Sequence, residues 1–130
     1  MSADIAFLRA LAREASALVM SVYETEFEVD DKGKDDPVTR ADREANALIC
    51  ERLAKRFPRA AICAEESPPT SEAERKRLRK AELSFFVDPV DGTREFVSRN
   101  GEFCVMIGAC RGGVPTLGVI AVPVENKLFW

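Results

Sequence analysis

Apolar residues recur every three or four positions through two early stretches of the chain, which is the spacing of a buried helix face. The first stretch covers residues 8–22 and fades near Phe27. The second covers residues 45–57 and ends at Pro58, which cannot continue a helix. The pattern therefore predicts two amphipathic helices, with a polar loop over residues 30–36 between them.

After these helices the pattern changes to short continuous apolar runs, which are typical of buried strands. Runs over residues 60–64 and 83–87 predict two strands. Between them, Ser71 followed by Glu74 has the spacing of a capping box that begins a short, highly charged helix. The two strands are thus expected to be joined through a helical connection.

Two longer apolar runs follow and predict an antiparallel hairpin. They cover residues 103–110 and 114–122, and the link over residues 111–113 contains two glycines, which is typical of a tight turn. Residues 128–130 begin another apolar run. The order of helices and strands predicts a layered α/β (α+β) sandwich of helices and a largely antiparallel sheet.

Composition fits one globular domain and argues against several kinds of partner. The 130 residues are 46% hydrophobic and 32% charged, with 22 acidic against 19 basic residues. This balance is unlike that of a nucleic-acid-binding domain, and it gives no reason to expect peripheral attachment to anionic membranes. No apolar run approaches the roughly 20 residues that cross a bilayer, and the N-terminus lacks the features of a secretory signal. We therefore predict a cytoplasmic protein.

The four cysteines give no sign of a metal site or a disulfide framework. Cys50, Cys63, Cys104 and Cys110 lie too far apart for a CxxC motif, and their number is low for a disulfide-rich scaffold. We expect them to be reduced residues of the core, as in a protein of a reducing compartment.

The most informative stretch is Asp88-Pro-Val-Asp91-Gly-Thr93, which follows the second predicted strand. Magnesium prefers oxygen ligands, and two carboxylates on a turn stiffened by Pro89 can hold such an ion. Two neighbouring acids also repel each other unless a cation neutralises them. The chain has no histidine, so its chemistry would rest on carboxylates, hydroxyls and metal-activated water. The alternative is an Asp-Pro turn with capping acids.

Gly92 and Thr93 extend this motif toward phosphate binding. Gly92 can adopt a positive φ and lets a ligand approach the backbone. A helical turn that begins at Thr93 would direct unpaired N–H groups at an anion. The alternatives are a simple turn glycine and an N-cap threonine.

Three acids upstream are candidates for the same site. Glu65 and Glu66 follow the first predicted strand as Asp88 follows the second, so parallel neighbouring strands would bring these carboxylates to one edge of the sheet. Asp42 follows Thr39 at capping-box spacing, and it is also a candidate to accept a proton from a hydroxyl of the site. The alternatives are two solvated loop acids and a helix cap.

Taken together, these motifs resemble the inositol monophosphatase superfamily. The resemblance rests on three ordered motifs: Asp36-Pro-Val-Thr-Arg-Ala-Asp42, Ala64-Glu-Glu-Ser and Asp88-Pro-Val-Asp-Gly-Thr. Two further segments are similar to the branch of 3′(2′),5′-bisphosphate nucleotidases: Asp91-Gly-Thr-Arg-Glu-Phe96 and Arg99-Asn-Gly-Glu-Phe103. The resemblance implies an αβαβα sandwich typical of sugar phosphatases, of which residues 1–130 would be the N-terminal metal-binding half.

The resemblance also implies a magnesium site with two or three ions. One Mg²⁺ ion would be bound by Glu65, Asp88 and the Val90 carbonyl. A second would be bound by Asp88 and Asp91, and Glu65 would also contact a third, weaker ion. Inhibition by lithium is expected of such a family.

The implied catalytic residues are Glu65, Asp42 and Thr93. Thr93, paired with Asp42, would orient and deprotonate the attacking water. The N–H groups of Gly92 and Thr93, together with Glu65, would hold the phosphate. The implied substrate is a small molecule, adenosine 3′,5′-bisphosphate, which would be cleaved to the 5′-monophosphate and phosphate as a step of sulfur metabolism.

Three interpretations stay open, because members of the family are about twice as long and their second half supplies another aspartate ligand and most nucleoside contacts. The chain could be the N-terminal half of a bisphosphate nucleotidase. It could instead act on inositol or another sugar phosphate, against which Arg94-Glu95 argues. It could also be an inactive fragment, or a metal-binding half that needs a partner segment, and a homo-oligomer is open too. We expect exposed apolar surface where the second half would pack.

Overall fold

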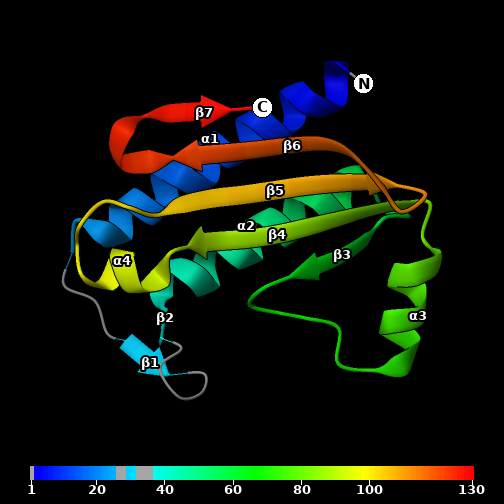
Figure 1. Cartoon of the computed structure of the whole chain (residues 1–130), viewed down its shortest axis with the longest axis horizontal. Coiled ribbons are helices and arrows are strands. Elements are labelled where there is room, and N and C mark those ends of the chain that lie inside the picture. Colours follow the sequence, from blue (N-terminus) through cyan, green and yellow to red (C-terminus); the bar gives the residue numbers. More distant parts are fainter. Residues whose placement is uncertain (1, 26–28, 32–36) are drawn as a thin grey trace.

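Two long helices pack against one face of a five-stranded sheet in the computed structural model of the chain, which describes residues 2–25, 29–31 and 37–130 (Figure 1). In chain order the elements are α1 (Ser2–Tyr23), β1 (Val29–Asp31), β2 (Pro37–Thr39), α2 (Arg40–Arg56), β3 (Ala61–Ala64), α3 (Glu72–Lys80), β4 (Leu83–Asp91), α4 (Thr93–Val97), β5 (Cys104–Arg111), β6 (Val114–Val122), the 3₁₀ turn η1 (Pro123–Glu125) and β7 (Lys127–Phe129). This arrangement confirms the layered α/β sandwich with a largely antiparallel sheet.

The core lies between the sheet and the apolar stripes of α1 and α2. The buried positions of these two helices keep the three- and four-residue spacing that predicted them: Leu8, Leu11, Ala15, Val19 and Val22 in α1, and Ala45, Ile49 and Leu53 in α2. Helix α1 ends at Tyr23, and Phe27, where the sequence pattern fades, is outside the described residues.

The sheet has the order β3-β4-β5-β6-β7, and one pair of strands in it is parallel. Strand β3 runs parallel to β4 with Ala64 opposite Val87, and every later pair is antiparallel. The helical connection between β3 and β4 is α3, which lies against β3 at the edge of the sheet (Figure 1). Because β3 and β4 are parallel, their C-terminal parts lie side by side. The predicted site depends on this condition.

Strand β4 differs from its prediction because it does not end at residue 87. It continues through Asp91, and the register with β5 shifts between Asp88 and Asp91. Pro89 was expected to form a turn, but it lies buried within this irregular part of the strand. A proline has no N–H to donate to a ladder, so strands accommodate it at such irregularities.

Smaller differences concern the loop before α2 and the start of α3. Asp30 and Asp31 were expected in a polar loop but belong to β1, which pairs with β2, while residues 32–36 are outside the described residues. At the start of α3, Ser71 Oγ accepts from the Glu74 N–H at 3.0 Å, but the Glu74 carboxylate accepts from the N–H of Thr70. In a standard capping box the Glu74 carboxylate would accept from the N–H of Ser71, so this second hydrogen bond is displaced by one residue.

The cysteines are free, as expected, but none of them is fully buried in the core, and Cys50 packs against its edge. Each of the four, Cys50, Cys63, Cys104 and Cys110, is only partly buried. In β5 the reason is strand alternation, because Val105, Ile107 and Ala109 point into the core and Cys104 and Cys110 point to the opposite face.

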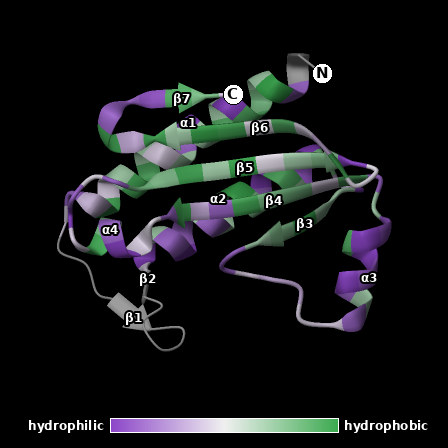
Figure 2. Cartoon of the chain, viewed as in Figure 1, coloured by the Kyte–Doolittle hydropathy of each residue, from purple (hydrophilic) through white to green (hydrophobic). Residues whose placement is uncertain are grey.

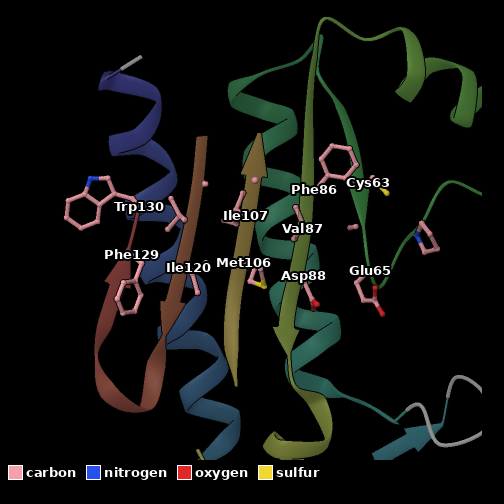
Figure 3. A pocket seen from close by; sticks show the side chains of 15 residues that line it. Cys63, Glu65, Phe86, Val87, Asp88, Met106, Ile107, Ile120, Phe129 and Trp130 are labelled. Atoms are coloured by element: carbon pink, nitrogen blue, oxygen red, sulfur yellow. The ribbon is translucent and has the colours of Figure 1, made fainter. Parts of the chain in front are cut away.

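The face of the sheet that points away from α1 and α2 carries exposed apolar side chains. Phe86 is 44% exposed, Ile120 37%, Phe129 55% and Trp130 64%. They line an open pocket of about 820 Å³ across β3 to β7 (Figure 3). Hydropathy colouring shows the sheet strands as mostly apolar, whereas α3 is strongly polar (Figure 2). The expected exposed apolar surface is thus present.

Within the part of the chain that the structure describes, no helix combines the length and the apolar character that a membrane span requires.

Candidate metal centre

The ends of β3 and β4 bring Glu65 and Asp88 together. Because the two strands are parallel neighbours, the residue that follows β3 lies beside the last part of β4, and the Glu65 N–H donates to the Val87 carbonyl at 2.9 Å. Figure 3 shows the Glu65 and Asp88 side chains next to each other at these strand ends. Glu65 is exposed and Glu66 is partly buried. The predicted meeting of the two acidic segments is therefore confirmed.

Asp88 and Asp91 place two carboxyl groups close together, where their negative charges repel each other. The Asp88 pKa is raised from its ordinary value of 3.8 to about 7, first because the carboxyl is partly buried, and then because the charges of Asp91, Glu65 and Asp42 lie near it. Asp88 Oδ1 is buried and has no hydrogen-bond partner. A buried carboxylate oxygen without a partner among like charges fits a cation as its partner.

The irregularity in β4 sets the direction of these two acids. The side chains of residues three apart in a regular strand point to opposite faces. Here the register shift between Asp88 and Asp91 changes that alternation, and the two carboxyl groups lie near enough for Asp91 to raise the pKa of Asp88. The buried Val90 between them turns its carbonyl toward Thr93, whose hydroxyl contacts it at 3.1 Å.

Thr93 and Asp42 form a hydroxyl–carboxylate pair on the other side of this segment. Thr93 Oγ1 lies 3.0 Å from Asp42 Oδ1 and donates to it. Asp42 is completely buried, and its Oδ2 accepts from the N–H and the hydroxyl of Thr39 at 2.9 and 2.7 Å. The capping box is present as well, so the cap and the candidate site partner are one and the same side chain.

Gly92 makes the sharp change of direction from β4 into α4. It has φ +93° as the N-cap of α4, the helical turn that was expected to begin at Thr93. A Cβ at this position would lie 2.9 Å from the Glu102 carbonyl oxygen, which belongs to the backbone and cannot rotate away. Glycine is therefore required here by both conformation and space.

Two residues near the site were not foreseen from the sequence. Cys104 pairs with Asp91 across β4 and β5, and its thiol donates to Asp91 Oδ2 at 3.7 Å. Burial, followed by the Asp91 charge, raises the pKa of the Cys104 thiol to about 11, so it is a neutral donor. This contact follows from the register between β4 and β5, and the apolar runs of the sequence do not specify that register.

Arg99 is the second unforeseen residue, and it fixes α4 to the end of α1. Its guanidinium donates to the Tyr23 carbonyl at 2.5 Å and to the Thr25 carbonyl at 2.6 Å. The Tyr23 ring also packs on Phe96 and Phe103, with ring centroids 5.1 and 5.0 Å apart. These contacts hold the short α4 segment, and hence Thr93, against the core.

The donor set suits a hard divalent cation such as magnesium. Asp88, Asp91 and Glu65 have carboxylate oxygens, and the Val90 carbonyl oxygen has two lone pairs, at most one of which engages the Thr93 hydroxyl. Among the described residues, no three Asp, Glu, Cys or His side chains already converge as a ready-made ligand cluster. Magnesium usually keeps several waters, so a pair of carboxylates with a third nearby is a sufficient protein contribution.

Comparison with known proteins adds a consistent picture. Residues 1–130 match the inositol monophosphatase family. The chain is 39% identical over 122 residues to the 3′(2′),5′-bisphosphate nucleotidase CysQ of Salmonella typhimurium, covering 92% of this chain and 48% of the relative. It is 34% identical to an inositol-1-monophosphatase of Synechocystis, covering 88% of this chain and 38% of that protein. The chain thus spans about half the length, or less, of the curated relatives it matches.

Solved structures agree with the sequence comparison. The extragenic suppressor protein suhB of Bartonella henselae superimposes with a TM-score of 0.85 at 30% identity, covering 98% of this chain and 48% of that one. CysQ from Bacteroides thetaiotaomicron, described as a bacterial member of the inositol monophosphatase family, superimposes with a TM-score of 0.72 at 37% identity, covering 91% of this chain and 41% of that one. Both likenesses run through nearly the whole chain.

Proposed function

Because the chain belongs to the inositol monophosphatase family, we propose that it is the magnesium-binding half of a phosphate monoesterase. The observation that carries this proposal is the orphaned, buried Oδ1 of Asp88 beside Asp91, at the sheet edge where Thr93 and Asp42 also meet. The relatives have about twice the length of this chain, so the activity is proposed for a protein that also has the remaining half.

Four residues would hold the metal in this proposal. Asp88, Asp91 and Glu65 would bind through their carboxylates and Val90 through its carbonyl, around two or three Mg²⁺ ions. Bound magnesium would supply positive charge that offsets the carboxylates and stabilises a phosphoryl group during transfer. The unpartnered oxygen of Asp88 and its raised pKa support a cation at this place rather than a solvated turn.

Thr93 and Asp42 would handle the proton of the attacking water. The Thr93 hydroxyl has one hydrogen, which it would donate to Asp42 Oδ1, the nearer of its two acceptors, and its oxygen would then accept from a water molecule. A water held there would pass its proton through the hydroxyl to the buried Asp42 carboxylate. The two hydrogen bonds from Thr39 keep that carboxylate in one orientation throughout.

The phosphate would lie at the start of α4. Gly92 is the N-cap of α4 in a left-handed conformation. The first N–H groups of a helix have no partner within that helix, so those that follow Gly92 could donate to a phosphate oxygen. Glu65 would face the phosphate from the end of β3, separated from it by the metal. The side chains of this cluster are acidic and would repel a phosphate, so the proposal depends on magnesium to supply the positive charge that binds it.

We propose adenosine 3′,5′-bisphosphate as the substrate, with loss of the 3′-phosphate. The name and 39% identity of the CysQ relatives support this choice, as does the Arg94-Glu95 pair that follows Thr93. An inositol phosphate is the second candidate, because a curated relative of 34% identity is an inositol-1-monophosphatase. Measuring phosphate release from both substrates side by side decides between them.

The metal assignment is tested with Asp91→Asn. A protein of the relatives' length that contains this chain is expected to release phosphate only with Mg²⁺, and Asp91→Asn should reduce the rate at least about 100-fold, since even residues behind the ligands cost 10–100-fold. The control is Asp4→Asn, which removes a carboxylate on α1 that pairs with Arg56 far from the site. An unchanged rate in Asp91→Asn contradicts the metal assignment.

The chain alone is a second sample in the same assay. We expect weak or no phosphate release from the 130 residues, because the second half of the relatives would be missing from the substrate site. Mg²⁺ binding to the same sample, measured by isothermal titration calorimetry, should nevertheless be detectable and weakened by Asp91→Asn. Substantial turnover by the chain alone would overturn the proposal that it is half of a site.

A further inference from the structure

Helix α2 buries two polar side chains on one face. Asp42 is fully buried and Asn46 is 9% exposed, whereas the remaining buried residues of the helix are apolar: Ala41, Ala45, Ile49 and Leu53. Residues four apart lie one turn above each other on the same face. Burial of an amide costs free energy unless the amide is hydrogen-bonded, so the partner of Asn46 indicates what the residue does.

These two side chains contact the two segments that carry the metal site. Asp42 Oδ1 accepts from the hydroxyl of Thr93, which follows β4. Asn46 Nδ2 donates to Ser67 Oγ at 3.0 Å, and Ser67 follows β3. Both contacts join residues far apart in the sequence, so one face of α2 is tied to both strand ends.

Ser67 closes the turn that contains Glu65. Its N–H donates to the Ala64 carbonyl at 3.2 Å, and the two residues form an isolated bridge. At the front of the turn the Glu65 N–H is held by the Val87 carbonyl of β4. The turn is therefore anchored at its beginning to the sheet and at its end, through the Ser67 side chain, to Asn46.

We propose that Asn46 is a positioning residue for the metal site, which holds the Glu65 turn through Ser67 Oγ at a fixed place relative to Asp88. Asn46 contacts neither metal nor substrate. A turn that is already ordered loses less conformational freedom when its carboxylate engages an ion, so binding is tighter. The inference rests on the proposed metal site and extends it to a residue outside the ligand set.

The test compares Mg²⁺ affinity in variants that remove either end of this hydrogen bond. Asn46→Ala and Ser67→Ala are each expected to raise the Mg²⁺ dissociation constant of the 130-residue chain about fivefold in calorimetry, which corresponds to about 1 kcal/mol. The double variant should also show about a fivefold change, because each single substitution already removes the hydrogen bond between Asn46 and Ser67. Asn46→Ala also removes the acceptor of the Cys50 thiol, a contact within α2 that does not involve the Glu65 turn. Ser67→Thr keeps the hydroxyl and should keep the wild-type affinity.

Two control variants separate positioning from general stability. Ser71→Ala removes the N-cap hydroxyl of α3, and Leu48→Ala trims a partly buried side chain on α2. Both should lower the melting temperature in EDTA and leave Mg²⁺ affinity unchanged. Ser67→Ala should lower the melting temperature too, because it leaves the buried Asn46 amide without this partner, but it alone of the three should also weaken Mg²⁺ binding. If Asn46→Ala does not fold, exposed Ser67 supplies the deciding variant.

The outcomes distinguish this inference from the proposed function. Wild-type Mg²⁺ binding with an unchanged dissociation constant in Ser67→Ala overturns the positioning role and leaves the metal site standing. Absence of Mg²⁺ binding in the wild-type chain overturns the metal site, and the positioning role with it. A weakened affinity in Ser67→Thr equal to that in Ser67→Ala also contradicts the role assigned to the hydroxyl.

Discussion

Substitution of Gly92 by alanine should damage the fold and the site together, because two independent costs meet at this residue. The first cost is conformational: Gly92 has φ +93°, a region that L-residues with a Cβ adopt reluctantly. The second is steric, because the added Cβ would lie 2.9 Å from the Glu102 carbonyl oxygen. Real Cβ atoms are almost never that close to backbone, so either α4 or the start of β5 must move.

The size of the effect can be built up from a matched variant. Gly112, in the hairpin between β5 and β6, also has a positive φ, but a Cβ there would meet nothing within 4 Å. Gly112→Ala should therefore cost only the conformational term, about 1–2 kcal/mol. Gly92→Ala should cost that amount and about 1–3 kcal/mol more for overpacking, hence about 2–5 kcal/mol in total.

Urea unfolding followed by circular dichroism measures both variants. The free energy of unfolding is obtained from the midpoint, provided that the dependence on urea is unchanged between variants. Mg²⁺ affinity should also fall in Gly92→Ala, because a backbone shift at residue 92 moves the neighbouring proposed ligand Asp91 relative to Asp88, and it should stay constant in Gly112→Ala. Equal destabilisation by the two substitutions, to within about 0.5 kcal/mol, would show that the contact with Glu102 is not a real constraint.

Two further predictions concern charge. Asp88→Asn should stabilise the metal-free chain at pH 8 by about 1–2 kcal/mol, a value reduced from the full shift because the carboxyl is half exposed. Because the Asp88 pKa is raised on folding, the stability that wild-type Asp88 contributes is fully present below its ordinary pKa of 3.8 and is lost as pH rises through the folded pKa of about 7. The stabilisation by Asp88→Asn should therefore vanish near pH 4 in unfolding curves measured in EDTA. A stabilisation that does not depend on pH would refute this reasoning. Arg99→Ala removes the bonds to the Tyr23 and Thr25 carbonyls and should cost about 1–2 kcal/mol in urea unfolding, more than Arg52→Ala, which breaks only an exposed ion pair; equal costs would refute a structural role for Arg99.

The elements that the sequence predicted well are those whose burial pattern is local. Helices α1 and α2 and the β5–β6 hairpin each repeat their apolar spacing over many residues, so the pattern survives without knowledge of neighbours. Strand β4 was predicted too short because Pro89 normally interrupts a strand. The continuation to Asp91 depends on pairing with β5, and β1 has only three residues, too few to show a period.

The candidate site divides in the same way. Asp88, Asp91, Gly92 and Thr93 are close in the sequence, so their shared location could be inferred directly. The placement of Glu65 followed from a conditional argument, which required β3 and β4 to be parallel neighbours, and the structure satisfies that condition. No such argument was available for the residues that support the site from outside the motifs.

The residue types alone determined that this protein has a core, two amphipathic helices and a cluster of oxygen donors without histidine, since these properties belong to single segments of the chain. The family resemblance implied the pairing of Thr93 with Asp42, and the structure confirms that contact. Only the tertiary structure decided that Cys104 lies beside Asp91 and that Asn46 donates to Ser67. These contacts join segments separated by 13 to 51 residues. Their existence depends on strand register and helix packing, which are set by the whole core at once and not by any local pattern.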